Sequence, residues 1–279
     1  MTIVDGLETV TSPDGTSIGY RTYGSGPGVV LVPGALHSGH HYQELACCLA
    51  DEFTIYAMDR RGRPGSGRQL PHHSIDDECA DVMAVMEKTG ASRLFGHSSG
   101  GVVALQTALR VQVTKVAVYE PAVMGPASVP PVKDLAAMER ALAEGRQTDA
   151  FAMLAKGESG PVPKMPLFAL KMLFRLASKG TNARFREYVD AVAAFPAEQR
   201  MIMGLGAEAD RYRELATETL VLLGARTGGE LARGARFLAA TAPGARLQVL
   251  AGLNHDAPDE KAPGRVAAEL RPYFSRSSL

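Results

Sequence analysis

The sequence predicts an α/β fold: a mostly parallel sheet, covered by helices on both faces, with a long helical insertion late in the chain. Short apolar runs alternate with helical segments between residues 28 and 121, which is the pattern of repeated βαβ units. This alternation stops between residues 122 and 215, where the chain is helical and interrupted by prolines, and it resumes at residue 219. We therefore expect a core domain of residues 1–121 and 216–279, and a helical cap subdomain of residues 122–215 between strands six and seven.

Local patterns predict the elements in order. Residues 7–11 and 17–23 alternate in polarity around Ser12-Pro13-Asp14-Gly15, a turn sequence, and predict an N-terminal β-hairpin. The later apolar runs predict strands buried on both faces; they are residues 28–32, 53–58, 92–96, 113–119, 219–224 and 247–251. Helical spacing predicts helices at residues 41–51, 75–89, 100–110, 230–241 and 258–273. Ligands bind at the carboxyl edge of such sheets, so the order of elements predicts an enzyme whose cleft lies under a cap.

Composition excludes several classes of partner. Lys plus Arg and Asp plus Glu number 30 each, so the chain lacks the basic surplus of a nucleic-acid binder. No uninterrupted apolar stretch reaches the ~18 residues of a spanning helix, and the first residues do not resemble a signal peptide. Cys47, Cys48 and Cys79 fit neither a disulfide framework nor a metal site. We expect a cytoplasmic protein with no metal, cofactor, nucleic-acid or membrane partner, and leave a homodimer open.

One segment, Gly96-His97-Ser98-Ser99-Gly100, has the G-x-S-x-G pattern of a serine nucleophile. A predicted strand ends just before it and a predicted helix begins within it, as in an elbow that holds a strained serine above the sheet. The alternative is an ordinary strand–helix turn with a capping serine, but the context favours Ser98 as a nucleophile. The backbone N–H of Ser99 then lies at a helix N-terminus, where it can stabilise an oxyanion.

With this motif, the chain resembles the α/β-hydrolase fold family, in particular its serine esterases and lipases with a helical cap. Three further segments carry the resemblance. Leu31-Val32-Pro33-Gly34-Ala35 is similar to the family's oxyanion loop, residues 57–66 to its D-x-R-G-x-G-x-S turn, and residues 252–258 to its loop with the catalytic histidine. The resemblance implies that the Ala35 N–H is the second oxyanion donor and that Asp59 supports a structural turn.

A serine hydroxyl needs a base to remove its proton as it attacks, and seven histidines compete for that role. His255 follows the last predicted strand, so its loop should emerge at the same sheet edge as Ser98. His72 and His73 lie in a loop beside Pro71, with no partner evident. His255 is therefore the predicted base.

The orienting acid departs from the family pattern. Many members carry an aspartate shortly after strand seven, but Thr227 stands there in this chain, and a hydroxyl cannot stabilise an imidazolium as a carboxylate does. Glu120 directly follows the predicted strand 113–119, at the edge near the elbow, and haloalkane dehalogenases take their acid from a similar place. We predict Glu120 as the acid, against the alternative of a structural strand cap. Asp256 and Asp259 are poorer choices because they are sequence neighbours of the base.

The predicted substrate is a small hydrophobic acyl compound. The insertion is rich in methionine and leucine, and flexible methionines suit irregular apolar ligands, although most of these side chains should simply pack the cap. The candidate pocket residues are Leu36, His37, Met124, Phe168 and Met172.

These observations support three alternative hypotheses about the function. The first is hydrolysis of a carboxylic ester, thioester or lactone through an acyl-serine intermediate. The second keeps the same triad for acyl transfer, C–C bond hydrolysis, perhydrolysis or a lyase reaction. The third, suggested by Thr227, is a non-catalytic ligand-binding member of the fold.

Overall fold

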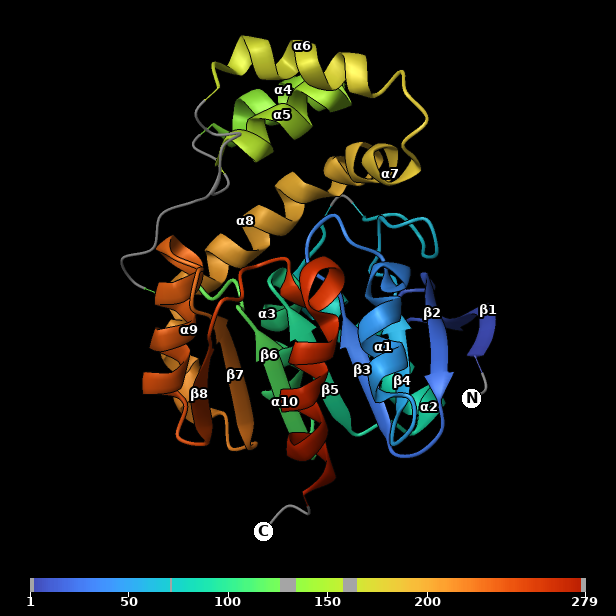
Figure 1. Ribbon diagram of the computed structural model, residues 1–279, viewed down its shortest axis with the longest axis vertical. Helices are drawn as coiled ribbons and strands as arrows, with labels where there is room; N and C mark the ends of the chain where they lie inside the picture. Colours follow the sequence, from blue (N-terminus) through green and yellow to red (C-terminus); the bar gives the residue numbers. More distant parts are fainter. Residues whose placement is uncertain (1–2, 71, 126–133, 158–164, 277–279) are drawn as a thin grey trace. The chain divides into compact units, whose positions relative to one another are not determined.

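The computed structural model describes residues 3–70, 72–125, 134–157 and 165–276. Its sheet has the strand order β1-β2-β4-β3-β5-β6-β7-β8 (Figure 1). The strands are β1 (Ile3–Thr11), β2 (Ser17–Gly24), β3 (Gly28–Val32), β4 (Thr54–Met58), β5 (Arg93–His97), β6 (Lys115–Tyr119), β7 (Thr219–Gly224) and β8 (Ala245–Leu250). The pairs β1–β2 and β2–β4 are antiparallel, and the strands from β4 through β8 pair in parallel. The predicted mostly parallel sheet is confirmed.

Helices cover both faces of this sheet. One face packs against α2 (Ile75–Thr89), α3 (Ser99–Ala108) and α9 (Gly229–Thr241). The other packs against α1 (Gln43–Leu49), which continues from the 3₁₀ turn η1 (Gly39–Tyr42), and against α10 (Pro263–Ser275).

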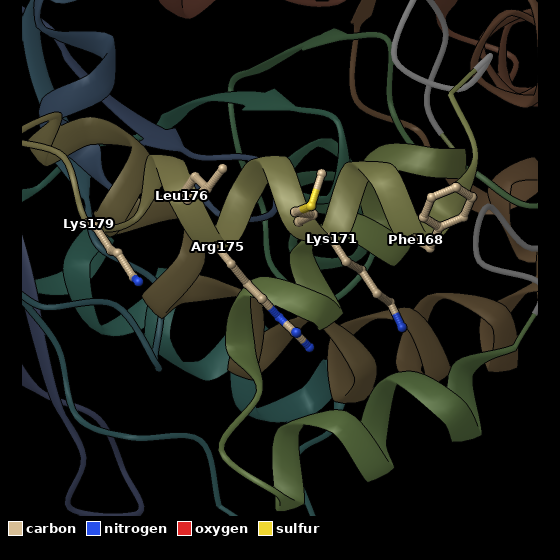
Figure 2. A pocket seen from close by; sticks show the side chains of 6 residues that line it. Phe168, Lys171, Arg175, Leu176 and Lys179 are labelled. Carbon is tan, nitrogen blue, oxygen red and sulfur yellow. The ribbon is translucent and has the colours of Figure 1, made fainter.

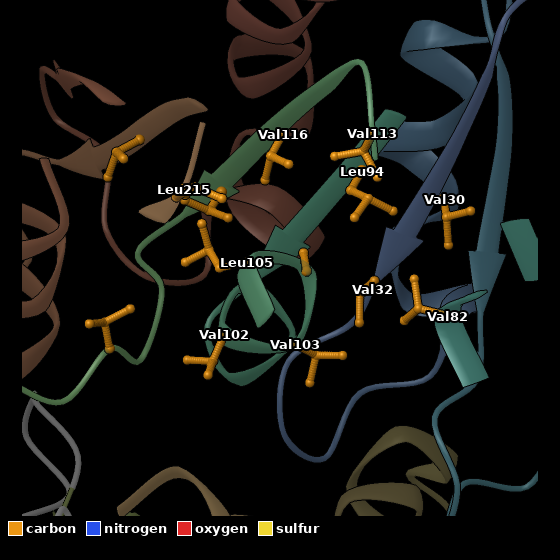
Figure 3. Close-up of a cluster of buried hydrophobic side chains, with 14 of the residues drawn as sticks. Val30, Val32, Val82, Leu94, Val102, Val103, Leu105, Val113, Val116 and Leu215 are labelled. Carbon is orange, nitrogen blue, oxygen red and sulfur yellow. The ribbon is translucent and has the colours of Figure 1, made fainter. Parts of the chain in front are cut away.

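Two buried clusters explain why the apolar runs show no alternation. On β3, Val30 and Val32 lie in the cluster of the α2–α3 face, and Val29 and Leu31 in the cluster of the α1–α10 face. Figure 3 shows part of the first cluster, in which these two valines join Leu94 and Val116 from the neighbouring strands. A strand with both faces buried must be apolar at every position, which is what made these strands recognisable in the sequence.

The described residues between β6 and β7 are mainly helical. It forms α4 (Leu135–Ala143), α5 (Gln147–Gly157), α6 (Leu167–Ala177), α7 (Ala183–Ala191), η3 (Val192–Ala194), α8 (Phe195–Leu205) and η4 (Gly206–Glu214). By internal contacts the chain divides into one unit of Met1–Ser128 with Met201–Leu279 and a second unit of Val129–Arg200. The predicted insertion, residues 122–215, contains the whole second unit.

The second unit has its own aromatic and ionic contacts. The ring of Phe151 on α5 lies 5.2 Å from that of Phe174 on α6 and 5.6 Å from that of Phe185 on α7. Buried Asp149 on α5 pairs with Arg146 and with Arg175 on α6. None of the described helices is long and apolar enough to cross a bilayer.

Candidate active site

Ser98 stands at a sharp turn between β5 and α3. Its backbone has φ 53° and ψ −120°, a strained conformation for a residue with a side chain. The turn closes tightly because glycine flanks it: a Cβ on Gly96 would lie 2.5 Å from the Gly100 carbonyl oxygen, and one on Gly100 2.3 Å from that of Val32. Both glycines of the motif are therefore required by space, and the elbow holds Ser98 half-buried at the end of its strand.

The backbone of Ser98 is joined to the end of the neighbouring strand β6. Its N–H donates to the carbonyl of Tyr119 at 3.0 Å, and the N–H of Ala122 donates to the Ser98 carbonyl at 3.0 Å. These two hydrogen bonds bracket Glu120, which directly follows β6. The carboxylate and the elbow are thus fixed to the same part of the sheet edge.

Glu120 contacts the imidazole of His255. Its Oε2 lies 2.8 Å from Nδ1 of His255, and its Oε1 accepts the Gly224 N–H at 2.8 Å. Glu120 is fully buried, whereas the side chain of His255 is 29% exposed. A carboxylate only accepts hydrogen bonds, so the proton of a neutral His255 belongs on Nδ1, and Nε2 is then unprotonated. This is the tautomer that a general base for a hydroxyl needs.

Backbone strain also gathers at this site. Among the described residues, the non-glycine residues with positive φ are Leu36, Ser98 and Glu120, at 66°, 53° and 45°. Each such residue costs about 1–3 kcal/mol and persists where the surrounding structure holds it. Such strain clusters at functional sites, and among the described acidic residues only Glu120 has a positive φ.

The other candidate groups have different partners. Asp256 accepts hydrogen bonds from Lys261 and Asn254, and Asp259 pairs with His37 at 3.0 Å. The Thr227 hydroxyl is buried, with no hydrogen-bond partner among the described residues. Asp59 accepts the Gly39 N–H at 2.6 Å and pairs with Arg21, so it holds a turn as the resemblance implied.

The loop after β3 passes beside Ser98. A Cβ on Gly34 would lie 3.2 Å from the Cβ of Ser98. The Gly34 N–H already donates to the Tyr42 hydroxyl at 3.1 Å, which leaves the Ala35 N–H as the next donor in the loop. The Ser99 N–H begins α3 and has no carbonyl partner within the helix. These two backbone groups are the candidate donors to an oxyanion.

Tyr42 and His97 form a connection that the sequence did not reveal. The Tyr42 hydroxyl lies 2.6 Å from His97 Nδ1, and its oxygen also accepts the Gly34 N–H. The His97 ring lies 4.6 Å from the His255 ring. Tyr42 thereby links the oxyanion loop to a histidine that packs against the candidate base. Tyr42 has no distinguishing sequence signal, since its partners are 8 and 55 residues away.

Burial keeps His97 uncharged. Desolvation holds the pKa of His97 well below its usual value of about 6.5, and the nearby His255 and His37 act in the same direction. In the unfolded chain His97 would titrate normally. The unfolded state therefore binds more protons below pH ~6.5, and this residue's contribution to stability is present above that pH and lost as the pH falls.

We predict a pH-dependent effect of His97→Asn, whose side-chain amide can either accept from or donate to the Tyr42 hydroxyl. Wild type should lose stability relative to the variant by up to about 1.4 kcal/mol for each pH unit below 6.5. Urea denaturation of both proteins at pH 7.5, 6.5, 5.5 and 5.0 measures this difference. Parallel stability curves over that range would show that His97 is not held neutral by the fold.

His37 ties the oxyanion loop to the loop of the candidate base. Its Nδ1 lies 2.8 Å from the carbonyl oxygen of Ala35, and its Nε2 lies 3.0 Å from Asp259 in the turn η5 (Ala257–Lys261). A carbonyl only accepts, so Nδ1 donates to the Ala35 oxygen, while Nε2 faces the carboxylate of Asp259. His37 therefore fixes the peptide that follows Ala35.

The predicted pocket residues lie in both units. Leu36 and His37 are half-buried in the oxyanion loop, and Met124 is half-buried after β6. Phe168 and Met172 lie on α6 of the second unit and are exposed by 75% and 61%. A pocket formed by these five residues stays a prediction.

Comparison with known proteins identifies the family. Residues 29–269 match the model of the alpha/beta hydrolase family, and the chain belongs to that family. An alpha/beta hydrolase structure from Sphaerobacter thermophilus is 32% identical with a TM-score of 0.80, over 96% of this chain and all of that one. The esterase RhEst1 from Rhodococcus is 20% identical with a TM-score of 0.72, over 97% and 99% of the two chains; it shares the fold.

A curated relative is similar over a shorter region. An uncharacterized hydrolase of Bacillus subtilis, YraK, is 32% identical over 114 residues, which are 39% of this chain and 41% of that protein. The match thus spans about two fifths of the relative's length.

Proposed function

We propose that this protein is a serine hydrolase that cleaves a carboxylic ester, thioester or lactone of a hydrophobic small molecule through an acyl-Ser98 intermediate. The observation that carries the proposal is the pair formed by buried Glu120 and His255, beside an elbow that strains Ser98. The family membership and the esterase fold neighbour support it.

The first half of the reaction would form an acyl-enzyme. Ser98 Oγ attacks the acyl carbon while Nε2 of His255 takes the hydroxyl proton. The carboxylate of Glu120 stabilises the resulting imidazolium through Nδ1–H. The N–H groups of Ala35 and Ser99 stabilise the oxygen of the tetrahedral intermediate, each by about 3 kcal/mol. When the intermediate collapses, the bond to the leaving group breaks and His255 returns the proton to it.

The second half would release the acid. Water gives a proton to His255 Nε2 as it attacks the acyl carbon, and collapse of the second intermediate returns the proton to Ser98. The residues named carry every proton in both halves, so the proposed reaction needs no cofactor. The apolar side chains of Leu36 and Met124 near this edge suit a hydrophobic acyl group.

A fluorophosphonate probe tests the nucleophile directly. We expect stoichiometric labelling of wild type on the peptide that contains Ser98, and none of Ser98→Ala. Ser99→Ala is the matched control: it keeps the backbone N–H at the helix start, and its hydroxyl only accepts a hydrogen bond from Arg60, so it should be labelled like wild type.

A panel of chromogenic esters of graded acyl length should then show turnover that rises with chain length. Saturable binding of the esters without labelling or turnover would favour the hypothesis of a non-catalytic ligand-binding protein. Labelling without ester turnover would support the triad but not ester hydrolysis. It would favour the use of the same residues with another acyl acceptor or on another type of bond.

A further inference from the structure

Helix α6 in the second unit presents two apolar faces. On one face, Leu170 is fully buried and Phe174 packs its ring against those of Phe151 and Phe185, at 5.2 and 5.4 Å. The opposite side carries large apolar side chains that are exposed, namely Phe168 at 75%, Met172 at 61%, Leu173 at 47% and Leu176 at 60%. Because successive residues advance by about 100° around a helix, Phe168, Met172 and Leu176 form one stripe. Packing within the second unit therefore does not account for the exposed apolar side chains of this helix.

Basic side chains border the exposed stripe. Lys171, Arg175 and Lys179 recur at the same four-residue spacing, and together with Phe168, Met172 and Leu176 they line a shallow hollow along the helix (Figure 2). Figure 2 shows Lys171 and Arg175 extending from the same side of the helix. Apolar surface and cationic groups therefore lie side by side on one exposed face.

Positive charge predominates in the sequence of α6 and the segment that follows it. From residue 165 to residue 186 the chain contains Lys171, Arg175, Lys179, Arg184 and Arg186, and no aspartate or glutamate. The carboxylate of Asp149 on α5 forms ion pairs with Arg175 at 2.6 Å and with Lys171 at 3.9 Å. It also pairs with Arg146. Arg146 pairs with Glu144 as well, so two carboxylates serve three cations, on a chain whose total charge is zero. The segment keeps a local positive surplus.

We propose that this face of α6 docks the protein on the surface of an anionic lipid bilayer. An apolar stripe bordered by Lys and Arg is the pattern of helices that lie in the membrane interface, with apolar side chains in the acyl boundary and cations among the phosphates. Anionic headgroups attract such cations. The sequence expectation of no membrane partner rested on the missing spanning segment, which does not bear on a helix that lies in the interface.

Charge disfavours a second copy of the chain as the occupant. A two-fold dimer places the same patch of each subunit against itself. On α6 this arrangement would bring the Lys and Arg side chains of the two copies close together when the apolar stripes packed. Like charges repel each other strongly in an interface that excludes water. An anionic lipid surface satisfies both the apolar and the cationic part of the face.

Vesicle flotation of the full chain tests the proposal. We expect binding to vesicles of phosphatidylcholine with 30% phosphatidylglycerol that is at least tenfold stronger than binding to phosphatidylcholine alone, and that weakens in 0.5 M salt. Leu173→Ser/Leu176→Ser and Lys179→Glu should each reduce that binding at least threefold. Val249→Ser removes a side chain on β8 that is 46% exposed, and as the matched control it should bind like wild type.

Two further measurements keep the result interpretable. Thermal melting of each variant should match wild type, since the changed side chains are exposed, and light scattering after gel filtration should give the same mass for all of them. Equal binding of wild type and the α6 variants, or no preference for phosphatidylglycerol, would overturn the proposal. A dimer of wild type that the α6 variants lose would assign the face to a second copy instead.

Discussion

Replacing His255 with alanine should reduce kcat for the best chromogenic ester by about a millionfold, the size of effect seen when a triad base is removed. Without an imidazole, nothing else in the proposed site accepts the Ser98 proton, so the hydroxyl stays a poor nucleophile. The backbone oxyanion donors remain, so some residual rate above that of water is expected.

The fold should tolerate this change. The His255 side chain is 29% exposed and lies in a loop, so its truncation opens no large core cavity. Thermal melting should therefore remain close to wild type. His72→Ala, an exposed histidine in the loop before α2, is the matched control and should keep full activity. Turnover of His255→Ala within tenfold of wild type would show that another group acts as the base.

The sheet and the elbow were predictable because their signals are local. A parallel strand buried on both faces must be apolar at consecutive positions, as Val29 to Val32 are, so its sequence pattern reports its environment. The elbow needs glycine at positions 96 and 100 because the backbone of β3 and α3 lies within 2.5 Å of where a Cβ would stand. A spatial requirement of this kind restricts the residue type at a position, so it can be recognised in the sequence.

Glu120 could be proposed because topology brings strand ends together. The residue after β6 and the loop after β8 both emerge at the carboxyl edge of a parallel sheet, so their positions in the chain were enough to suggest their proximity. The sequence could not supply the positive φ of Glu120 or the Gly224 N–H that holds its second oxygen. Both depend on the packing of β7 beside β6.

The contacts around the oxyanion loop could not be predicted. The link from Gly34 through Tyr42 to His97, and the link from Ala35 through His37 to Asp259, join residues up to 222 positions apart through single polar atoms. No periodicity or spacing accompanies such contacts. They nevertheless explain how this loop is held beside Ser98: Tyr42 accepts the Gly34 N–H and His37 donates to the Ala35 carbonyl, which leaves the Ala35 N–H for a ligand.

Changing Glu120 to glutamine tests the least expected feature of the site. We expect kcat to fall by about 10⁴, as when a triad carboxylate becomes an amide, with little change in KM. The glutamine is nearly isosteric, and its Oε1 can still accept the Gly224 N–H. Its NH₂ group then faces Nδ1 of His255 and can only donate, so the imidazole proton moves to Nε2. The base is then held in the tautomer that cannot accept the Ser98 proton.

The outcome separates Glu120 from every other carboxylate near the base. Asp256→Asn is the matched control, because Asp256 lies beside His255 in sequence but pairs with Lys261, and its loss should change kcat by less than tenfold. Glu120→Asp should recover part of the rate lost in Glu120→Gln, since a carboxylate, although shorter, again favours Nδ1–H. A buried carboxylate that served only as a strand cap would give the opposite order: the glutamine, which preserves the bond to Gly224, would retain activity, and the shorter aspartate would lose it.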